Sequence, residues 1–265
     1  MASKRVEPGR GRKAGVVKSS QKATKNRFFY IIIALVAVAG IGALTYASTR
    51  GKTAAPVTRV DTTLPPVKSE GYVIGSPTAP LEVVEFGDFE CPGCSRFATV
   101  TEPDVRSRLI NTGQIRLRYI DFPLDMHPNS WNASRAAACA DEQSKFWEFH
   151  DALFMTQDQW AAANGNTKPD AFFKDLAKRL QLETGRFNEC VDTKKYQAKI
   201  QAHLKIGLDR KVNGTPTFII GDSLAGVVPY DHFKKLVDVA LAKSGAPKPS
   251  VSGDTATRPA LKSKK

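Results

Sequence analysis

The period of the hydrophobic pattern changes several times along the chain, and each change indicates a different kind of element. A continuous apolar run at residues 81–86 predicts a buried strand, whereas alternating apolar and polar residues at 115–122 predict a half-buried strand. Between these strands, the segment from Cys91 to about Asn111 is typical of a helix that Pro103 bends. The first part of the domain is therefore predicted to follow a β-α-β order.

A helical pattern alone continues from Trp131 to about Leu208, with breaks near residues 164–169 and 183–185. The strand pattern then returns at residues 215–220, and a turn leads into a second short strand and an amphipathic helix at 231–243. This order predicts an α/β sheet that carries a helical insertion at about residues 130–210.

An uncharged apolar segment of 21 residues, 28–48, precedes the domain and is long enough to cross a bilayer as a helix. Seven Lys and Arg residues lie between Arg10 and Arg27, against four between Arg50 and Lys68, so the N-terminus should stay in the cytoplasm. The alternative is a cleaved signal peptide, although its apolar and basic regions would be unusually long and no clear cleavage motif follows. We expect an uncleaved signal anchor, which would hold the domain at the cell membrane, and both interpretations place the domain outside the cytoplasm.

These features divide the chain into five parts. They are a basic cytoplasmic tail (1–27), a transmembrane signal anchor (28–48), a linker (49–70), one α/β domain (71–244) and a disordered basic tail (245–265). The formal net charge is +13, but the regions before residue 70 and after residue 244 together carry +15, which leaves −2 on the domain. A nucleic-acid-binding function of the domain therefore has little support.

Two of the four cysteines, Cys91 and Cys94, stand two residues apart between the first predicted strand and the helix. Pro92 favours the first turn of a helix, which places Cys91 at the N-cap. Free backbone N–H groups and the helix dipole stabilise a thiolate there, while Cys94 should be buried and protonated. This asymmetry supplies the nucleophile and the resolving thiol of thiol–disulfide exchange.

Two other interpretations of this pair are weaker. A zinc site needs two further ligands, and neither the remaining cysteines nor the four histidines have a ligand-like spacing. A purely structural disulfide would close too short a loop to remove much chain entropy. We therefore predict neither a metal nor a separate cofactor.

The second signal is Gly214-Thr-Pro-Thr-Phe218, which opens a strand about 120 residues downstream. Together with the strand, the CPGC motif, the helical insertion and the final hairpin and helix, it resembles the DsbA-like thiol–disulfide oxidoreductases of the thioredoxin superfamily in their membrane-anchored form. The resemblance covers residues 71–244. It implies a thioredoxin-like fold in which a Thr–cis-Pro loop lies against the active-site disulfide.

The resemblance also implies a role for particular residues. Cys91 is the attacking thiol and Cys94 the resolving thiol of a redox-active disulfide. Thr215 and Pro216 form the cis-Pro loop, which pairs with an extended substrate. Glu85 matches a buried acid that assists proton transfer, although an outward-facing strand carboxylate is an equal alternative.

The remaining polar residues near the motif are expected to point elsewhere. Glu90 should face solvent, and His127 should be a loop histidine without a role rather than a residue of the active-site rim. Strongly oxidising members of this group carry a histidine between the two cysteines, whereas this chain has Pro92 and Gly93.

Cys139 and Cys190 both fall in the helical insertion. Taken alone they could be two buried free thiols. The extracytoplasmic location and the resemblance imply a structural disulfide instead.

The predicted function is a protein thiol–disulfide oxidoreductase that introduces disulfides into exported proteins with free thiols. The resemblance implies a membrane reoxidant of the DsbB or vitamin K epoxide reductase type as its partner. The alternatives are a disulfide reductase or isomerase that uses the same pair, and a thioredoxin-fold binding or chaperone module without turnover.

Overall fold

A computed structural model describes residues 29–42, 58–59, 70–162 and 168–245. The chain divides into two units, Met1–Thr53 and Ala54–Lys265. In the first unit residues 29–42 are helical; the remainder of the predicted anchor lies outside the described residues. Within the described parts, no helix reaches the length and apolar character needed to cross a membrane.

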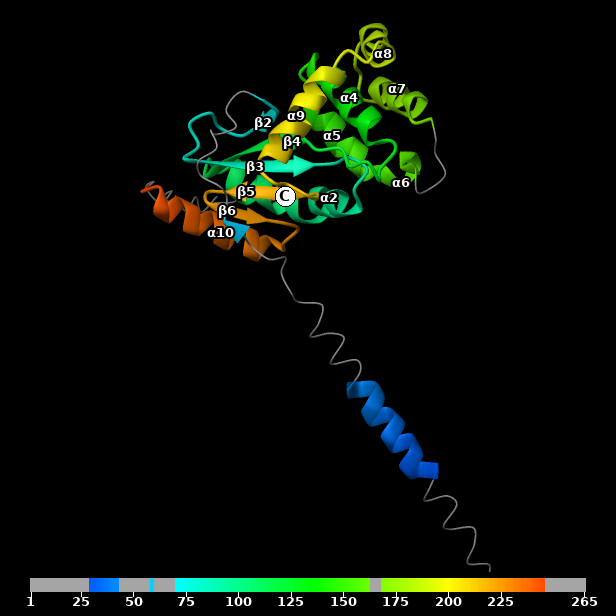
Figure 1. Cartoon of the computed structure of the whole chain (residues 1–265), viewed down its shortest axis with the longest axis vertical. Helices are drawn as coiled ribbons and strands as arrows, with labels where there is room; N and C mark the ends of the chain where they lie inside the picture. The colour runs from blue at the N-terminus through cyan, green and yellow to red at the C-terminus, as the bar shows by residue number, and fades with distance from the viewer. Residues whose placement is uncertain (1–28, 43–57, 60–69, 163–167, 246–265) are drawn as a thin grey trace, which may run out of the picture. The chain divides into compact units, whose positions relative to one another are not determined.

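The second unit contains the sheet and all the remaining helices of the described chain (Figure 1). In chain order its elements are β1 (Thr58–Arg59), β2 (Tyr72–Ile74), β3 (Leu81–Gly87), α2 (Pro92–Arg96), η1 (Phe97–Thr101), α3 (Glu102–Val105), η2 (Arg106–Ile110), β4 (Ile115–Asp121), α4 (Ser130–Asp141), α5 (Phe146–Met155), α6 (Gln157–Trp160), α7 (Asp170–Arg179), α8 (Thr184–Asp192), α9 (Gln197–Asp209), β5 (Thr217–Ile220), β6 (Ser223–Ala225) and α10 (Tyr230–Lys243).

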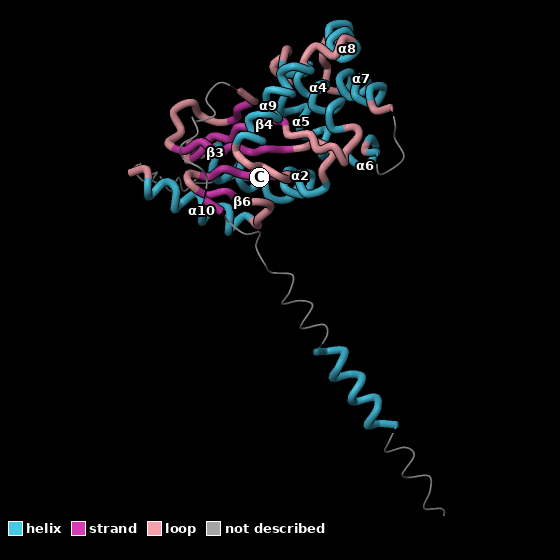
Figure 2. Tube along the Cα trace, in the orientation of Figure 1, coloured by secondary structure: helices cyan, strands magenta, loops and turns pink. Residues whose placement is uncertain are grey.

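The strands form one sheet in the order β1-β6-β5-β3-β4-β2, with β3 at its centre (Figure 2). β3 runs parallel to β4 and antiparallel to β5, and β5 runs antiparallel to β6. The parallel β3–β4 pair is connected by the helical run 92–110, as a crossover requires. This confirms the predicted thioredoxin-like α/β fold.

Helices cover both faces of the sheet. On one face Leu81, Val83 and Leu117 pack in a cluster with Leu109 of η2 and Phe233 of α10. On the other face a second hydrophobic cluster packs against α9. Its buried members are Val84, Phe86, Ile120, Phe122 and Val212. Because alternate residues of a strand point to opposite faces, Glu85 faces the same side as Leu81 and Val83, under the helical run.

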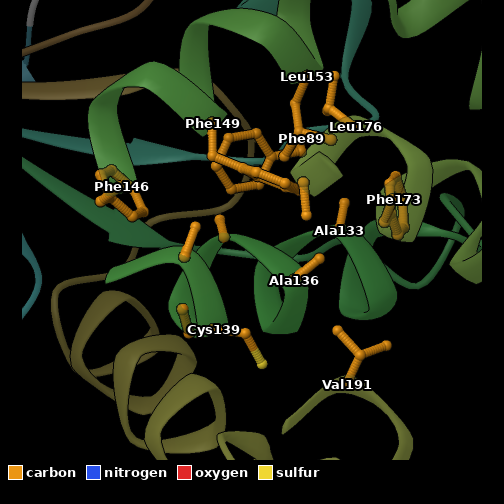
Figure 3. Close-up of a cluster of buried hydrophobic side chains, with 14 of the residues drawn as sticks. Phe89, Ala133, Ala136, Cys139, Phe146, Phe149, Leu153, Phe173, Leu176 and Val191 are labelled. Atoms are coloured by element: carbon orange, nitrogen blue, oxygen red, sulfur yellow. The ribbon is translucent and has the colours of Figure 1, made fainter. Parts of the chain in front are cut away.

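The predicted helical insertion is present as α4 to α9. The core of the insertion contains large aromatic side chains of α5 and small side chains of α4. Figure 3 shows that Phe89, from the turn before α2, lies among Phe149, Leu153 and Leu176 of the insertion. A disulfide joins Cys139 of α4 to Cys190 of α8. The insertion and the turn before α2 therefore share one core.

β4 is almost completely buried, so the prediction of a half-buried strand is wrong. Its alternating polar residues are arginines that lie against the neighbouring strand: Arg116 Nε is 2.6 Å and Arg118 Nε 2.9 Å from the carboxylate of Glu82. Paired in this way, Arg118 is only 6% exposed. The polar positions of this alternating pattern are therefore arginines paired with Glu82 and not side chains that face solvent.

Four further details differ from the sequence analysis. The helix after Cys91 changes between α and π turns on either side of Pro103, which has no N–H to continue a regular ladder. The helical pattern that begins at Trp131 is broken at Ser144, where φ is 57°, so the residues on either side of it form the two helices α4 and α5. β1 pairs with β6 although it lies in the predicted linker, and β2 adds an unpredicted edge strand.

Candidate active site

The two cysteines of the CPGC motif lie where β3 ends and α2 begins. Cys91 is the N-cap of α2 with extended backbone angles, and Pro92 occupies the first turn. Cys91 is 8% exposed, while Cys94, one turn further, is completely buried. Both are free thiols in this structure. The N-cap position predicted from Pro92 is therefore present, and only Cys91 is accessible for attack.

The cis-Pro loop lies directly against Cys91. The Thr215–Pro216 peptide bond is cis, and the Cys91 thiol donates a hydrogen bond to the Thr215 carbonyl over 3.3 Å. A Cβ added to Gly93 would lie 3.3 Å from Pro216 Cδ and 3.5 Å from Cys91 Sγ. A side chain at this position would crowd the loop, so glycine permits the close approach.

The two thiols differ strongly in acidity. A hydrogen bond from the Cys94 thiol is the largest cause that lowers the pKa of Cys91, to about 6, with help from the Thr215 side chain and the backbone N–H groups of Gly93 and Cys94 and against partial burial. Burial, followed by interaction with Cys91, raises the pKa of Cys94 well above its ordinary value. Cys91 is thus a thiolate at neutral pH while Cys94 keeps its proton, as exchange through an attacking and a resolving thiol requires.

Glu85 is buried under α2 and its neighbours, at 1% exposure, and its Oε2 has no hydrogen-bond partner. Burial, and then repulsion from Glu102, raise the pKa of Glu85 well above its ordinary value. Its charge also contributes to the raised pKa of Cys94. Glu85 is therefore buried and not an outward-facing carboxylate, while its part in proton transfer stays a prediction.

A second buried carboxylate, Glu102 of α3, lies beside this acid and was not found by the sequence analysis. Its Oε2 also lacks a partner, and its Oε1 accepts a hydrogen bond from Arg106 Nε at 2.8 Å. Arg106 in turn makes two bonds to Asp151 of α5, at 2.6 and 2.7 Å. The charged side chains of Glu102, Arg106 and Asp151 thus form a connected series that runs from the neighbourhood of Glu85 to the surface.

The residue that organises the active-site turn is Asp88, which the sequence analysis did not single out. Its backbone N–H donates to Cys94 Sγ at 3.4 Å, and its carbonyl accepts the Cys91 N–H at 3.1 Å. Its completely buried carboxylate accepts four hydrogen bonds. The donors are Glu90 N–H, Leu124 N–H, Ser130 Oγ and His127 Nδ1.

Glu90 does not face solvent, which corrects the expectation from the sequence. It is 5% exposed, and its carboxylate accepts the backbone N–H groups of Asn129, at 2.6 Å, and of Ala162. Hydrogen bonds from two backbone groups replace the hydration of this carboxylate. These partners are 39 and 72 residues away in sequence, so no local pattern could reveal them.

Gln157 of α6 also contacts the motif from the insertion. Its Nε2 donates to the carbonyls of Phe89, at 2.7 Å, and of Cys91, at 3.1 Å. Next to it, a surface hollow of about 490 Å³ borders Pro92, Ser95 and Met155, which is largely exposed. An extended chain bound at Cys91 has room for a side chain there.

The other two cysteines have no part in this site. The Cys139–Cys190 disulfide spans 51 residues and has a Cα–Cα distance of 5.8 Å, within the insertion. Across the described ranges, no group of three or more His, Cys, Asp and Glu side chains is placed to hold a metal ion.

A family model described as thioredoxin matches residues 68–239, more than half of the chain. The chain belongs to this thioredoxin family. BdbD from Bacillus subtilis, whose oxidised crystal structure is known, has a similar fold; the TM-score is 0.58 with 21% identity, over 72% of this chain and 100% of that one.

This thioredoxin-family chain is 26% identical to the probable disulfide bond formation protein D of Bacillus anthracis. That match covers 64% of this chain and 78% of the relative. It is also 34% identical, over 61% of its length, to a Na⁺/H⁺ antiporter NhaA 3 of Salinispora tropica. The chain spans only 23% of that antiporter.

Proposed function

We propose that this protein is a membrane-anchored, extracytoplasmic thiol–disulfide oxidoreductase that introduces disulfides into exported proteins. The observation that carries the proposal is the pairing of an acidic, accessible Cys91 with a buried, protonated Cys94 against the cis-Pro loop. The similarity to disulfide bond formation protein D supports the same chemistry.

The reaction begins with the Cys91–Cys94 disulfide. A substrate thiolate attacks Cys91 Sγ, forms a mixed disulfide and displaces Cys94, which takes up a proton. A second substrate thiolate then attacks the substrate sulfur of the mixed disulfide and displaces Cys91 as a thiolate. The substrate loses two electrons and gains a disulfide, and the enzyme ends as the dithiol seen here. The low pKa of Cys91 favours its departure in the second step.

The location and the partner rest on the sequence. The uncharged segment 28–48 and the excess of basic residues before it support a signal anchor with a cytoplasmic N-terminus. Reoxidation of the dithiol needs an acceptor of two electrons, and a membrane quinone reductase of the DsbB or vitamin K epoxide reductase type would supply it at the same membrane.

Trapping of substrate tests whether the protein is an enzyme. In the full chain, Cys94→Ser removes the resolving thiol, so mixed disulfides between Cys91 and exported proteins should accumulate and disappear on reduction. The double variant C91S/C94S is the matched control. Equal amounts of disulfide-linked protein from both variants would contradict the proposal and favour a binding module.

The equilibrium of the Cys91–Cys94 pair with glutathione tests the direction of exchange. A potential near that of DsbA, about −120 mV, supports a donor of disulfides. A potential near that of thioredoxin, about −270 mV, would overturn the oxidase assignment in favour of a reductase.

A further inference from the structure

The proposed function leaves one titratable group beside the active site unused. His127 lies in the loop between β4 and α4, with its side chain 15% exposed, and its Nδ1 is 2.7 Å from Asp88 Oδ2. The backbone fixes the loop around it: the His127 N–H donates to the Leu124 carbonyl, and the Ser130 N–H donates to the His127 carbonyl. The imidazole is therefore held in one orientation at the edge of the redox site.

The connection from His127 to the cysteines is short. Asp88 is hydrogen bonded to His127 through its carboxylate, to Cys94 Sγ through its N–H and to the Cys91 N–H through its carbonyl. The same carboxylate is fixed by three other donors, so it cannot turn away from the histidine without losing them. These hydrogen bonds connect the imidazole ring of His127 to the turn that carries Cys91 Sγ and Cys94 Sγ.

Three negatively charged groups act on His127. Its hydrogen bond with Asp88 is the largest cause that raises the pKa of His127; the charges of Asp88, Cys91 and Glu90 act in the same direction, and partial burial opposes them. The attraction between a Cys91 thiolate and a protonated His127 is mutual, so a positive charge on this ring favours the thiolate and offsets the opposing charge of the Asp88 carboxylate to which the ring is bonded. The CPGC motif has no histidine of its own to provide such a charge.

We propose that His127, oriented by Asp88, is a positioning residue that stabilises the Cys91 thiolate and so makes the redox pair more oxidising. The inference rests on the proposed thiol–disulfide exchange and adds a determinant of its potential. The cation comes from a loop that follows β4, about 35 residues after the motif, instead of from the two residues between the cysteines.

A direct test needs no substitution. The pKa of His127 is measured by NMR titration of its ring protons in the full-length reduced protein and again in the oxidised protein. A thiolate is present only in the reduced form, so the pKa of His127 should be higher there. Equal values for His127 in the two forms would overturn the inference.

Substitution tests the effect on the potential. In His127→Gln the pH midpoint of Cys91 ionisation should rise, and the equilibrium with glutathione should shift about 3- to 10-fold towards the oxidised protein, or about 15 to 30 mV. His127→Lys keeps a positive charge and should restore most of the shift, while His232→Gln should leave both quantities unchanged. An unaltered equilibrium in His127→Gln, with normal thermal unfolding, would refute the role of the histidine. Absence of exchange in the wild-type protein would instead refute the proposed function.

Discussion

Replacing Cys94 by alanine should raise the pKa of Cys91, because the hydrogen bond from the Cys94 thiol is the largest cause of its low value of about 6. At pH 7 a thiol with that pKa is ~90% thiolate, against ~1% for the ordinary value of 9.0. Thiolate nucleophilicity falls with pKa by a factor of about 30 over this range, so the net gain in attack rate is only ~3-fold. The low pKa therefore matters more for the departure of Cys91 from a mixed disulfide than for its attack.

The assay is the ultraviolet absorbance of the thiolate as a function of pH in the reduced full-length protein. The wild-type midpoint should lie near pH 6, and Cys94→Ala should move it upward by roughly one unit, whereas Cys94→Ser keeps a donor and should move it less. Cys91→Ser should show no transition in this range, because the pKa of Cys94 is raised far above it. A wild-type midpoint above about pH 8 would refute the assignment of Cys91 as the acidic thiol.

Two further predictions concern buried groups. Replacing both Cys139 and Cys190 by alanine should lower the free energy of unfolding by about 4 kcal/mol, as expected for a loop of 51 residues, without altering glutathione exchange at Cys91; a loss below about 1 kcal/mol in denaturant unfolding would contradict this. Because burial raises the pKa of Glu85 above its unfolded value, the free energy of unfolding should fall as pH rises above the ordinary range of a glutamate, and Glu85→Gln should remove that slope. A difference between Glu85→Gln and the wild type that does not change with pH would be evidence against a buried, protonated acid.

The features that were predicted well are those that depend on residues adjacent in the chain. Pro92 places Cys91 at a helix N-cap through its own fixed geometry, and the apolar run at 81–86 is buried in the centre of the sheet. The role of Pro216 needed the resemblance as well, because a proline before a strand is by itself only a turn. Local chemistry thus located the redox pair, and the family likeness located its partner loop.

The features that the sequence analysis missed depend on partners far away in the chain. Asp88, Glu90 and Gln157 are ordinary polar residues in the sequence, and their importance comes only from what they meet after folding. His127 was assigned no role for the same reason, since its Nδ1 contact lies 39 residues away. The half-buried prediction for β4 failed similarly, because an alternating pattern does not show whether a neighbouring strand supplies a counter-charge such as Glu82.

These long-range contacts also change the part played by the helical insertion. Phe89 belongs to the same buried cluster as Phe149 and Leu153, and Gln157 holds the carbonyls on both sides of Glu90. The Glu90 carboxylate accepts hydrogen bonds from the backbone N–H groups of Asn129, just before α4, and of Ala162, between α6 and α7. A buried carboxylate without hydrogen-bond donors costs several kcal/mol of folding free energy. The active-site turn therefore depends on the hydrogen bonds that the insertion donates to Glu90. The insertion is therefore a support that fixes the Cys91 N-cap, and a substitution in α6 can alter redox chemistry without touching either sulfur.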